Sequence, residues 1–255
     1  MAQLATRFRN FLRTVPGFVR IVRRIRYLAN RLTPRERIFE QIHLSNAWGS
    51  LESVSGGGST LTQTAVLRRE LPSMCSRFAV TSVLDAPCGD YNWMRQIKLP
   101  VEYYIGVDIV RGIIENNQSR FGGDRVSFLQ ADIIRDPLPR ATLIICRDCL
   151  VHLSFADIWR TLDNFRLSGA TFLLTTSFNT RPENESILTG QWWPLNLQRS
   201  PFCFPEPIDC IDEECSEGEG GYTDKTLSLW RLADLPISAR FGCDVSATSP
   251  RSVRH

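Results

Sequence analysis

The sequence predicts one α/β domain in which a mostly parallel β-sheet carries helices on both faces. From about residue 80, short apolar runs rich in β-branched residues alternate with amphipathic stretches of helical spacing, as in repeated β-α-β units. The length of 255 residues suits one such domain with additions. A hydrophobic content of 43% and a charged content of 22% are globular values, which excludes a disordered or fibrous chain.

The predicted strands and helices follow one another in a regular order. Strands are expected at residues 80–86, 103–109, 126–133, 143–147, 171–178 and 227–232. Helices are expected at residues 91–97, 111–120 and 155–167. Right-handed crossovers place helices on such a sheet, and ligands bind beyond the carboxyl ends of its strands. The loops after the strands are therefore where a functional site is expected.

A further helix is expected before the sheet. Thr33, Pro34 and Glu36 fit a helix start, with threonine as the N-cap, proline at the first helical position and glutamate completing a capping box. This helix would run towards Asn46.

A glycine-rich loop and a second helix complete the segment before the sheet. Residues 48–60 contain the run Ser-Gly-Gly-Gly-Ser, whose glycines permit close approach of the backbone to another group. Trp48 and Glu52 within this segment favour an ordered loop over a flexible linker. The second helix is expected over residues 62–71, ended by Pro72.

Residues 1–32 form a segment of different character. Ten arginines and two glutamates occupy residues 1–40, which leaves 20 basic and 25 acidic residues for the rest of the chain. Apolar residues recur at helical spacing opposite the arginines on both sides of Pro16-Gly17, which predicts two basic amphipathic helices. Three interpretations stay open: a helical appendage packed on the body or a partner subunit, a segment lying on an anionic membrane, or an organellar transit peptide.

Composition also limits the class and the compartment of the protein. The mildly acidic body argues against nucleic acid as the main substrate, because that role needs a basic face. The longest stretch without a charged residue, 53–67, has 15 residues, whereas a membrane-spanning helix needs about 20 apolar residues. Eight cysteines are too few for a disulfide scaffold and predict reduced thiols. We expect a cytoplasmic protein, with attachment to an anionic membrane through residues 1–32 as an option.

An aspartate stands at the end of four successive predicted strands. These residues are Asp85, Asp108, Asp132 and Asp148. One such residue is often only the N-cap of the next helix, whereas four in succession favour a ligand at this edge of the sheet. Asp108 follows Asp85 by 23 residues, and an acid at the end of the second strand offers two acceptor oxygens to the hydroxyl pair of a ribose.

The turn after the first strand discriminates among ribose-containing ligands. A dinucleotide pyrophosphate site has the pattern Gly-x-Gly-x-x-Gly at the start of a helix. Here the turn is Pro87-Cys88-Gly89-Asp90, with one glycine and an additional carboxylate. This turn suits a ligand with an amino group and a sulfonium better than a pyrophosphate, which disfavours a nicotinamide-dependent oxidoreductase.

Four motifs follow one another in this order: Val-Leu-Asp-Ala-Pro-Cys-Gly-Asp, Gly-Val-Asp, Gln-Ala-Asp and Cys-Arg-Asp-Cys-Leu-Val-His-Leu. Together they resemble the ordered motifs of class I S-adenosylmethionine-dependent methyltransferases. The resemblance covers residues 80–178 and departs from the family at Pro87, where the first loop glycine usually stands. The glycine-rich loop at 48–59 and the segment at 190–205, with its Trp-Pro-Leu-Asn-Leu and Pro-Phe-Cys-Phe-Pro runs, resemble a bacterial-type subgroup.

The resemblance implies a Rossmann-like methyltransferase domain over residues 33–245. Within it, residues 33–79 would form a helical lid, 80–178 the cofactor-binding core, and 179–245 the acceptor-side segment with the last strands. Residues 246–255 are expected to be a frayed tail.

The resemblance also assigns residues to the cofactor S-adenosylmethionine. The Asp85–Gly89 turn would hold its methionine end, and Asp108 its ribose diol. Asp132 would bind the adenine amino group, while Arg147 and Asp148 would line the transfer site. The whole expected cofactor set is Asp85, Pro87, Cys88, Gly89, Trp93, Asp108, Ile109, Asp132, Ile133 and Arg147.

His152 and Asp148 are the candidate catalytic residues. Methyl transfer is an in-line displacement that depends on alignment and desolvation, and a hydroxyl acceptor also needs a base. His152 is the candidate base, and Asp148 lies four residues earlier, on the same face if the segment is helical. The alternative is that His152 only packs or hydrogen-bonds in its loop.

The flanking segments are expected to form the acceptor pocket. Flat apolar faces beside hydrogen-bonding groups suit a sugar or another polyhydroxylated or amphipathic metabolite, and a small satellite core is the alternative for the aromatic residues. Cys146 and Cys149 have the spacing of a redox or metal pair but lack a second pair, so no metal site is predicted. The expected acceptor-binding residues are Trp48, Ser59, Trp193, Asn196 and Phe202.

The leading hypothesis is therefore an S-adenosylmethionine-dependent methyltransferase that O-methylates a small or glycan-like acceptor without metal. N-methylation of a small amine is the runner-up, since aromatic rings and carboxylates also bind cations. A module that binds the cofactor without catalysis is the third hypothesis, because fold alone does not establish chemistry.

Removal of residues 1–32 tests the membrane interpretation of that segment. If the segment binds an anionic surface, a chain that starts at Thr33 should fold and bind cofactor but lose the salt-sensitive association with anionic liposomes. Co-sedimentation measures this association, and equal sedimentation of the two chains would contradict the membrane interpretation. Loss of folding on truncation would support packing on the body instead.

Overall fold

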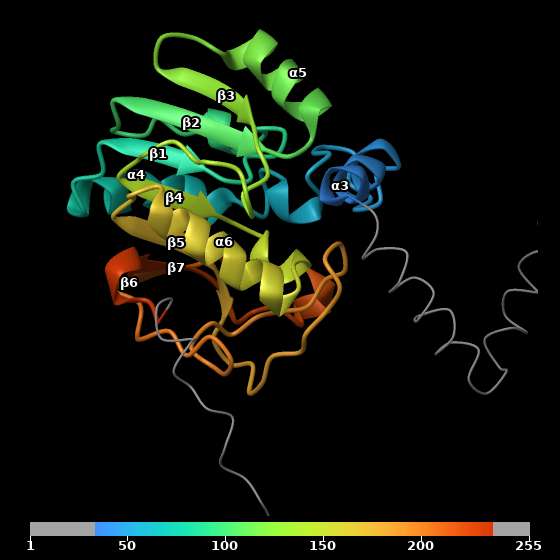
Figure 1. Cartoon of the computed structure of the whole chain (residues 1–255), viewed down its shortest axis with the longest axis vertical. Coiled ribbons are helices and arrows are strands. Elements are labelled where there is room, and N and C mark those ends of the chain that lie inside the picture. The colour runs from blue at the N-terminus through green and yellow to red at the C-terminus, as the bar shows by residue number, and fades with distance from the viewer. Residues whose placement is uncertain (1–33, 237–255) are drawn as a thin grey trace, which may run out of the picture.

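The computed structural model describes residues 34–236, which form one seven-stranded sheet with helices on both sides (Figure 1). The order of strands across the sheet is β3-β2-β1-β4-β5-β7-β6. β7 runs antiparallel to its two neighbours, and the other neighbouring pairs are parallel. The strands are β1 (Ser82–Asp85), β2 (Tyr103–Asp108), β3 (Val126–Gln130), β4 (Leu143–Cys146), β5 (Phe172–Phe178), β6 (Asp209–Asp212) and β7 (Lys225–Arg231).

Helices cover both faces of the sheet, which confirms the predicted fold class. α6 packs on one face, and α4 and α5 pack on the other. α3 precedes these helices in the chain and lies beside the edge at which the parallel strands end (Figure 1). The α-helices of the described part are α3 (Arg35–Leu44), α4 (Ala65–Arg77), α5 (Arg111–Phe121) and α6 (Phe155–Leu167).

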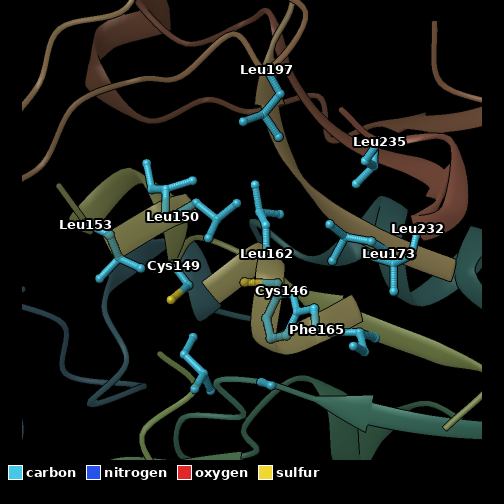
Figure 2. Close-up of a cluster of buried hydrophobic side chains, with 14 of the residues drawn as sticks. Cys146, Cys149, Leu150, Leu153, Leu162, Phe165, Leu173, Leu197, Leu232 and Leu235 are labelled. Carbon is cyan, nitrogen blue, oxygen red and sulfur yellow. The ribbon is translucent and has the colours of Figure 1, made fainter. Parts of the chain in front are cut away.

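The central strands are buried on both faces, because their side chains alternate between two cores. In β1, Leu84 joins the core under α6, whereas Val83 joins the core under α4. Figure 2 shows the core under α6, where Leu162 and Phe165 of the helix lie close to Leu173 of β5. Burial on both faces explains why these strands are continuous apolar runs in the sequence.

The prediction that Pro72 ends the second helix is wrong. α4 begins at Ala65 and continues through Pro72 to Arg77. Proline removes one backbone hydrogen bond from the helix, and apolar packing on both sides of it outweighs that loss. The buried residues of this helix are Leu67, Leu71, Met74 and Cys75.

The start of α3 also differs from the prediction. Pro34 occupies the N-cap position rather than the first helical position, and no side chain caps the helix. The predicted N-cap, Thr33, lies outside the described residues. Glu36 accepts a hydrogen bond from Nε2 of Gln130 at the end of β3 (2.9 Å), so its carboxylate helps to hold α3 against the sheet.

Two elements were mistaken or missed by the sequence analysis. Residues 91–97 form turns and a short 3-10 helix at Met94–Gln96 rather than the predicted helix. The edge strand β6 was not predicted, because Ile211 alone of its four residues is buried and no apolar alternation marks it. The predicted appendage at 1–32 and the tail at 246–255 lie outside the described residues.

Within residues 34–236, no helix is both long enough and apolar enough to cross a membrane.

Truncation of Phe165 tests the core under α6. The ring is fully buried between the helix and the sheet, so Phe165→Ala should lower the free energy of unfolding by about 3–5 kcal/mol. Urea unfolding measures the change. Leu167→Ala, two residues further along α6 at an exposed position, is the control and should change it by less than about 0.5 kcal/mol. Equal losses in the two variants would contradict this core.

Candidate functional site

All ten residues expected to bind the cofactor line one cavity at the carboxyl ends of the parallel strands. The turn after β1 forms one wall, and the loops after β2, β3 and β4 form the others. Part of α3 also lines the cavity, through Arg35, Phe39 and His43. The topology thus brings four segments that are far apart in the chain to one place.

Asp108 lies at the end of β2 and connects the first turn to the second strand. Its Oδ1 accepts a hydrogen bond from the backbone N–H of Val110 (2.9 Å), and its Oδ2 accepts one from the N–H of Gly89 (3.2 Å). Burial raises the pKa of Asp108 to about 6, although these N–H groups lower it in part. The side chain is therefore mostly ionised at neutral pH, with further lone pairs for hydroxyl donors.

Asp85 is a second buried carboxylate in this cavity. Its Oδ2 accepts a hydrogen bond from the hydroxyl of Tyr104 (2.6 Å). Burial raises the pKa of Asp85 to about 7, although the Tyr104 bond lowers it in part; the nearby charge of Asp108 is a smaller contribution that raises it. A positively charged group in the cavity would favour the ionised form of both carboxylates.

Asp132 lines the cavity but already has an arginine partner. Its Oδ2 accepts hydrogen bonds from Nε (3.0 Å) and Nη2 (2.8 Å) of Arg35 on α3. Its Oδ1 accepts the backbone N–H of Ile134 (3.0 Å). In this arrangement Arg35 holds one carboxylate oxygen of the residue that was expected to bind an adenine amino group.

Asp90, the additional carboxylate of the first turn, anchors the glycine-rich loop and does not line the cavity. Its Oδ1 accepts hydrogen bonds from the hydroxyls of Ser53 (3.0 Å) and Ser55 (3.2 Å), and its Oδ2 accepts the N–H of Val54 (2.9 Å). A Cβ on Gly89 would lie 2.2 Å from Oγ of Ser55, so only glycine permits this close approach. The loop is ordered, as the sequence analysis expected.

A network of buried charges lies beside this cavity, at the ends of β4 and β6 and the start of β7. Arg147 donates hydrogen bonds to Glu213 from Nε (3.2 Å) and Nη2 (2.6 Å), and its Nη1 lies 3.2 Å from Oδ2 of Asp148. Nζ of Lys225 donates to the same oxygen of Asp148 (2.7 Å) and lies 3.4 Å from Glu213. Glu217 is the outermost member, 3.9 Å from Nζ of Lys225.

This network fixes Asp148 as an anion. Burial alone would raise the pKa of Asp148, but Arg147 and Lys225 outweigh burial and hold it well below its ordinary value. Asp148 also has a left-handed backbone (φ 50°), which is uncommon outside glycine. Its N–H donates to Oγ1 of Thr176 on β5 (2.8 Å), which supports that conformation.

His152 lies in a short 3-10 helix at Leu150–His152, close to Asp148. Nδ1 is 2.8 Å from the carbonyl oxygen of Gln191, so we assign the proton to Nδ1, which leaves Nε2 as an acceptor. The imidazole also packs against Trp48, with ring centroids 5.3 Å apart. Burial lowers the pKa of His152, although the Gln191 carbonyl and Asp148 offset this in part. The ring is therefore neutral at pH 7.

A second cavity of about 340 Å³ adjoins the first. The two cavities share four lining residues: Trp48, Ser55, Asp148 and His152. The other walls of the second cavity are aromatic and glycine-rich, with one acidic and one basic side chain. They comprise Gly56, Gly57, Gly58, Phe178, Trp192, Cys215, Glu217, Gly218, Tyr222 and Lys225.

Three of the residues expected to bind an acceptor line neither cavity. Phe202 is fully buried against Phe155 and Trp159, and Asn196 donates hydrogen bonds to the backbone of Asn179 (3.1 Å) and Arg181 (2.9 Å). Trp193 packs against the core under α6, while its neighbour Trp192 faces the second cavity. These placements argue against an acceptor role and support the satellite-core alternative. Trp48 lines both cavities, and Ser59 lines the first.

Four charged residues of the two cavities and their network were not predicted from the sequence: Arg35, Glu213, Glu217 and Lys225. Lys225 could have been noticed, because it is one of only two lysines in the chain and stands at the start of the apolar run that forms β7. The glutamates had none, since they lie in a polar, acidic segment typical of a surface loop.

Cys146 and Cys149 are buried and free, and hydrogen bonding to Cys146, with burial, raises the pKa of Cys149. In residues 34–236, no group of three or more His, Cys, Asp and Glu side chains is placed to hold a metal ion.

No protein-family model and no curated protein matches this sequence. Among solved structures, human N-acetylserotonin methyltransferase in complex with SAM aligns with a TM-score of 0.48 and 14% identity, over 64% of this chain and 51% of that chain. The alignment thus spans about half the length of the human protein. The N-methyltransferase NodS from Bradyrhizobium japonicum, in complex with S-adenosyl-L-homocysteine, aligns with a TM-score of 0.46 and 14% identity, over 64% of this chain and 86% of that chain.

Proposed function

We propose that this protein is an S-adenosylmethionine-dependent methyltransferase that O-methylates a small, polyhydroxylated or glycan-like acceptor. The observation that carries the proposal is the meeting of two cavities at Asp148 and His152. The first cavity contains the aspartates that are expected to bind a cofactor. The second cavity has aromatic and polar walls that suit an acceptor. A methyl group transferred from a cofactor in the first cavity to an acceptor in the second would move past Asp148 and His152.

The residues of the first cavity fit the proposed cofactor. Asp108 has lone pairs for a ribose diol, and its N–H partners fix both of its oxygens. Asp85 and Asp108 are buried carboxylates that a cationic ligand would stabilise in their ionised form. Ile109 and Ile133 add apolar surface to the cavity. For Asp132 to bind an adenine amino group, Arg35 would have to move or share its oxygen.

When bound, S-adenosylmethionine supplies a methyl carbon on a positively charged sulfur, which is electrophilic without help from a metal. The protein's own residues align the acceptor and take its proton. The lowered pKa of His152 keeps the ring neutral, and Gln191 fixes the tautomer in which Nε2 accepts. As the acceptor oxygen attacks the methyl carbon, Nε2 of His152 would take the hydroxyl proton and later release it to solvent. The carbon–sulfur bond would break with its electron pair on sulfur, so that S-adenosyl-L-homocysteine leaves as a neutral thioether.

N-methylation of a small amine is the second candidate. It is favoured by the aromatic rings of Trp48, Trp192 and Tyr222, which stand beside Glu217 in the second cavity. An amine nucleophile attacks in its neutral form and needs His152 less. A module that binds the cofactor without catalysis would bind it tightly and transfer no label to any component of a cell extract.

Asp108→Ala tests the cofactor site. The variant should weaken S-adenosylmethionine binding by about 1–3 kcal/mol, because it removes a charged acceptor of hydrogen bonds. Calorimetry measures the affinity, and Asp124→Ala, at an exposed position outside the cavity, should leave it unchanged. Unchanged affinity in Asp108→Ala would remove this residue from the ribose site.

His152→Ala tests the base. The chemical step should slow by about 10²–10⁴, with little change in cofactor affinity. In the unaltered protein, activity requires the neutral ring and should fall as the pH drops through the pKa of His152, which lies below its ordinary value of 6.5. The pH profile of the His152→Ala variant should lack this acidic limb, the fall in activity at low pH. Near-normal turnover of His152→Ala on the true acceptor would reject the base and favour the amine alternative.

Asp148→Asn separates the two roles at the shared wall. The acidic limb should persist at a lower pH, because the carboxylate of Asp148 raises the pKa of His152. A pH–rate profile of single-turnover reactions measures it. Disappearance of the limb in this variant would make Asp148 the titrating group instead of His152.

A further inference from the structure

The second cavity combines aromatic rings with a carboxylate that is only weakly paired. Phe178, Trp192 and Tyr222 form a cluster, with ring centroids 5.0–6.1 Å apart. Glu217 lines the same cavity with about a third of its side chain exposed, and the nearest cation in an ion pair with it is Nζ of Lys225 at 3.9 Å. Aromatic faces beside a carboxylate are the usual means of binding an organic cation.

The charges beside this cavity leave a negative surplus. The network contains two cations, Arg147 and Lys225, and three carboxylates, Asp148, Glu213 and Glu217. The short contacts, all under 3.5 Å, join the two cations to Asp148 and Glu213. Glu217 is therefore the carboxylate with capacity for a further partner.

The other cation near these rings does not compensate for Glu217. Arg181 lies over the rings of Phe178 and Tyr222, but it pairs with Asp224 (3.1 Å) and does not line the cavity. The neutral His152 adds no charge at pH 7. A cationic group on the acceptor would thus meet uncompensated negative charge.

Resting on the proposed methyltransferase function, we infer that the acceptor is a hydroxylated organic cation, such as an amino alcohol or amino sugar, and that Glu217 selects it. The ammonium group binds between Glu217 and the aromatic cluster. A hydroxyl group of the same molecule reaches His152 on the shared wall. The protonated nitrogen has no lone pair for the methyl group, so the hydroxyl oxygen is the atom that accepts it.

A matched pair of probes tests the charge preference. Choline and 3,3-dimethylbutan-1-ol have nearly the same shape, and only choline carries a positive charge. With the full chain saturated with S-adenosyl-L-homocysteine, titration followed by tryptophan fluorescence should give a Kd at least tenfold lower for choline. Glu217→Gln should abolish this preference, whereas Glu219→Gln, at an exposed position in the same segment and outside the cavity, should retain it.

Binding of S-adenosyl-L-homocysteine to each variant separates the possible failures. If the unaltered chain does not bind S-adenosyl-L-homocysteine, the proposed function itself is rejected. Normal binding with equal affinities for the two probes, or with no detectable binding of either, would overturn the inference and leave the proposed function standing. If Glu217→Gln weakens both probes equally, the residue has a structural role and the inference also fails.

The charge of the natural product gives a second readout. The full chain is incubated with methyl-labelled S-adenosylmethionine and a small-molecule cell extract, and charcoal then removes all adenine compounds. The remaining label should bind a cation exchanger at pH 7 and should decrease at least tenfold with Glu217→Gln. Label in neutral or anionic fractions would overturn the inference, although the methyltransferase proposal would be supported.

Discussion

The geometry of the site depends on the buried pairing of Arg147 and Lys225 with Asp148 and Glu213. Removing such charges from water costs several kcal/mol for each ion, and their mutual attraction offsets this only when all partners are in place. The sheet topology provides these partners. β4 and β6 end at the same edge, and the antiparallel β7 begins there, which places Lys225 beside residues that follow the other two strands. The reversed strand is thus what completes the network.

The glycine-rich loop is the second constraint, and its composition follows from what it contacts. Asp90 holds its serines, while its glycines lie against the charged network. A Cβ on Gly58 would lie 3.0 Å from Oδ2 of Asp148, and one on Gly57 would lie 3.0 Å from Glu217. Side chains there would crowd these carboxylates, so glycine lets the backbone close this wall of the second cavity against the network.

Local and long-range information explain what the sequence did and did not predict. The parallel strands were predictable because burial on both faces leaves continuous apolar runs, and the strand-end acids followed from the order of strands and loops. Pro72 misled because tertiary packing decided the length of α4. Phe202 and Asn196 were predicted to bind the acceptor because the sequence around an aromatic or amide side chain does not reveal the direction in which it points. The partners Glu213 and Lys225 are separated from Arg147 by 66 or more residues, and only the fold brings them together.

In the proposed mechanism, the two residues on the shared wall have different roles, although their surroundings lower the pKa values of both. His152 loses affinity for protons through burial but keeps an accepting Nε2, whereas the pKa of Asp148 is held far lower by Arg147 and Lys225. In that mechanism Asp148 would not compete for the acceptor proton, and it would remain an anion beside the ring that receives the proton. Preorganised negative charge at the place where positive charge develops is a main source of catalysis in enclosed sites. The same network thereby positions the wall and, in the proposed mechanism, would stabilise the imidazolium.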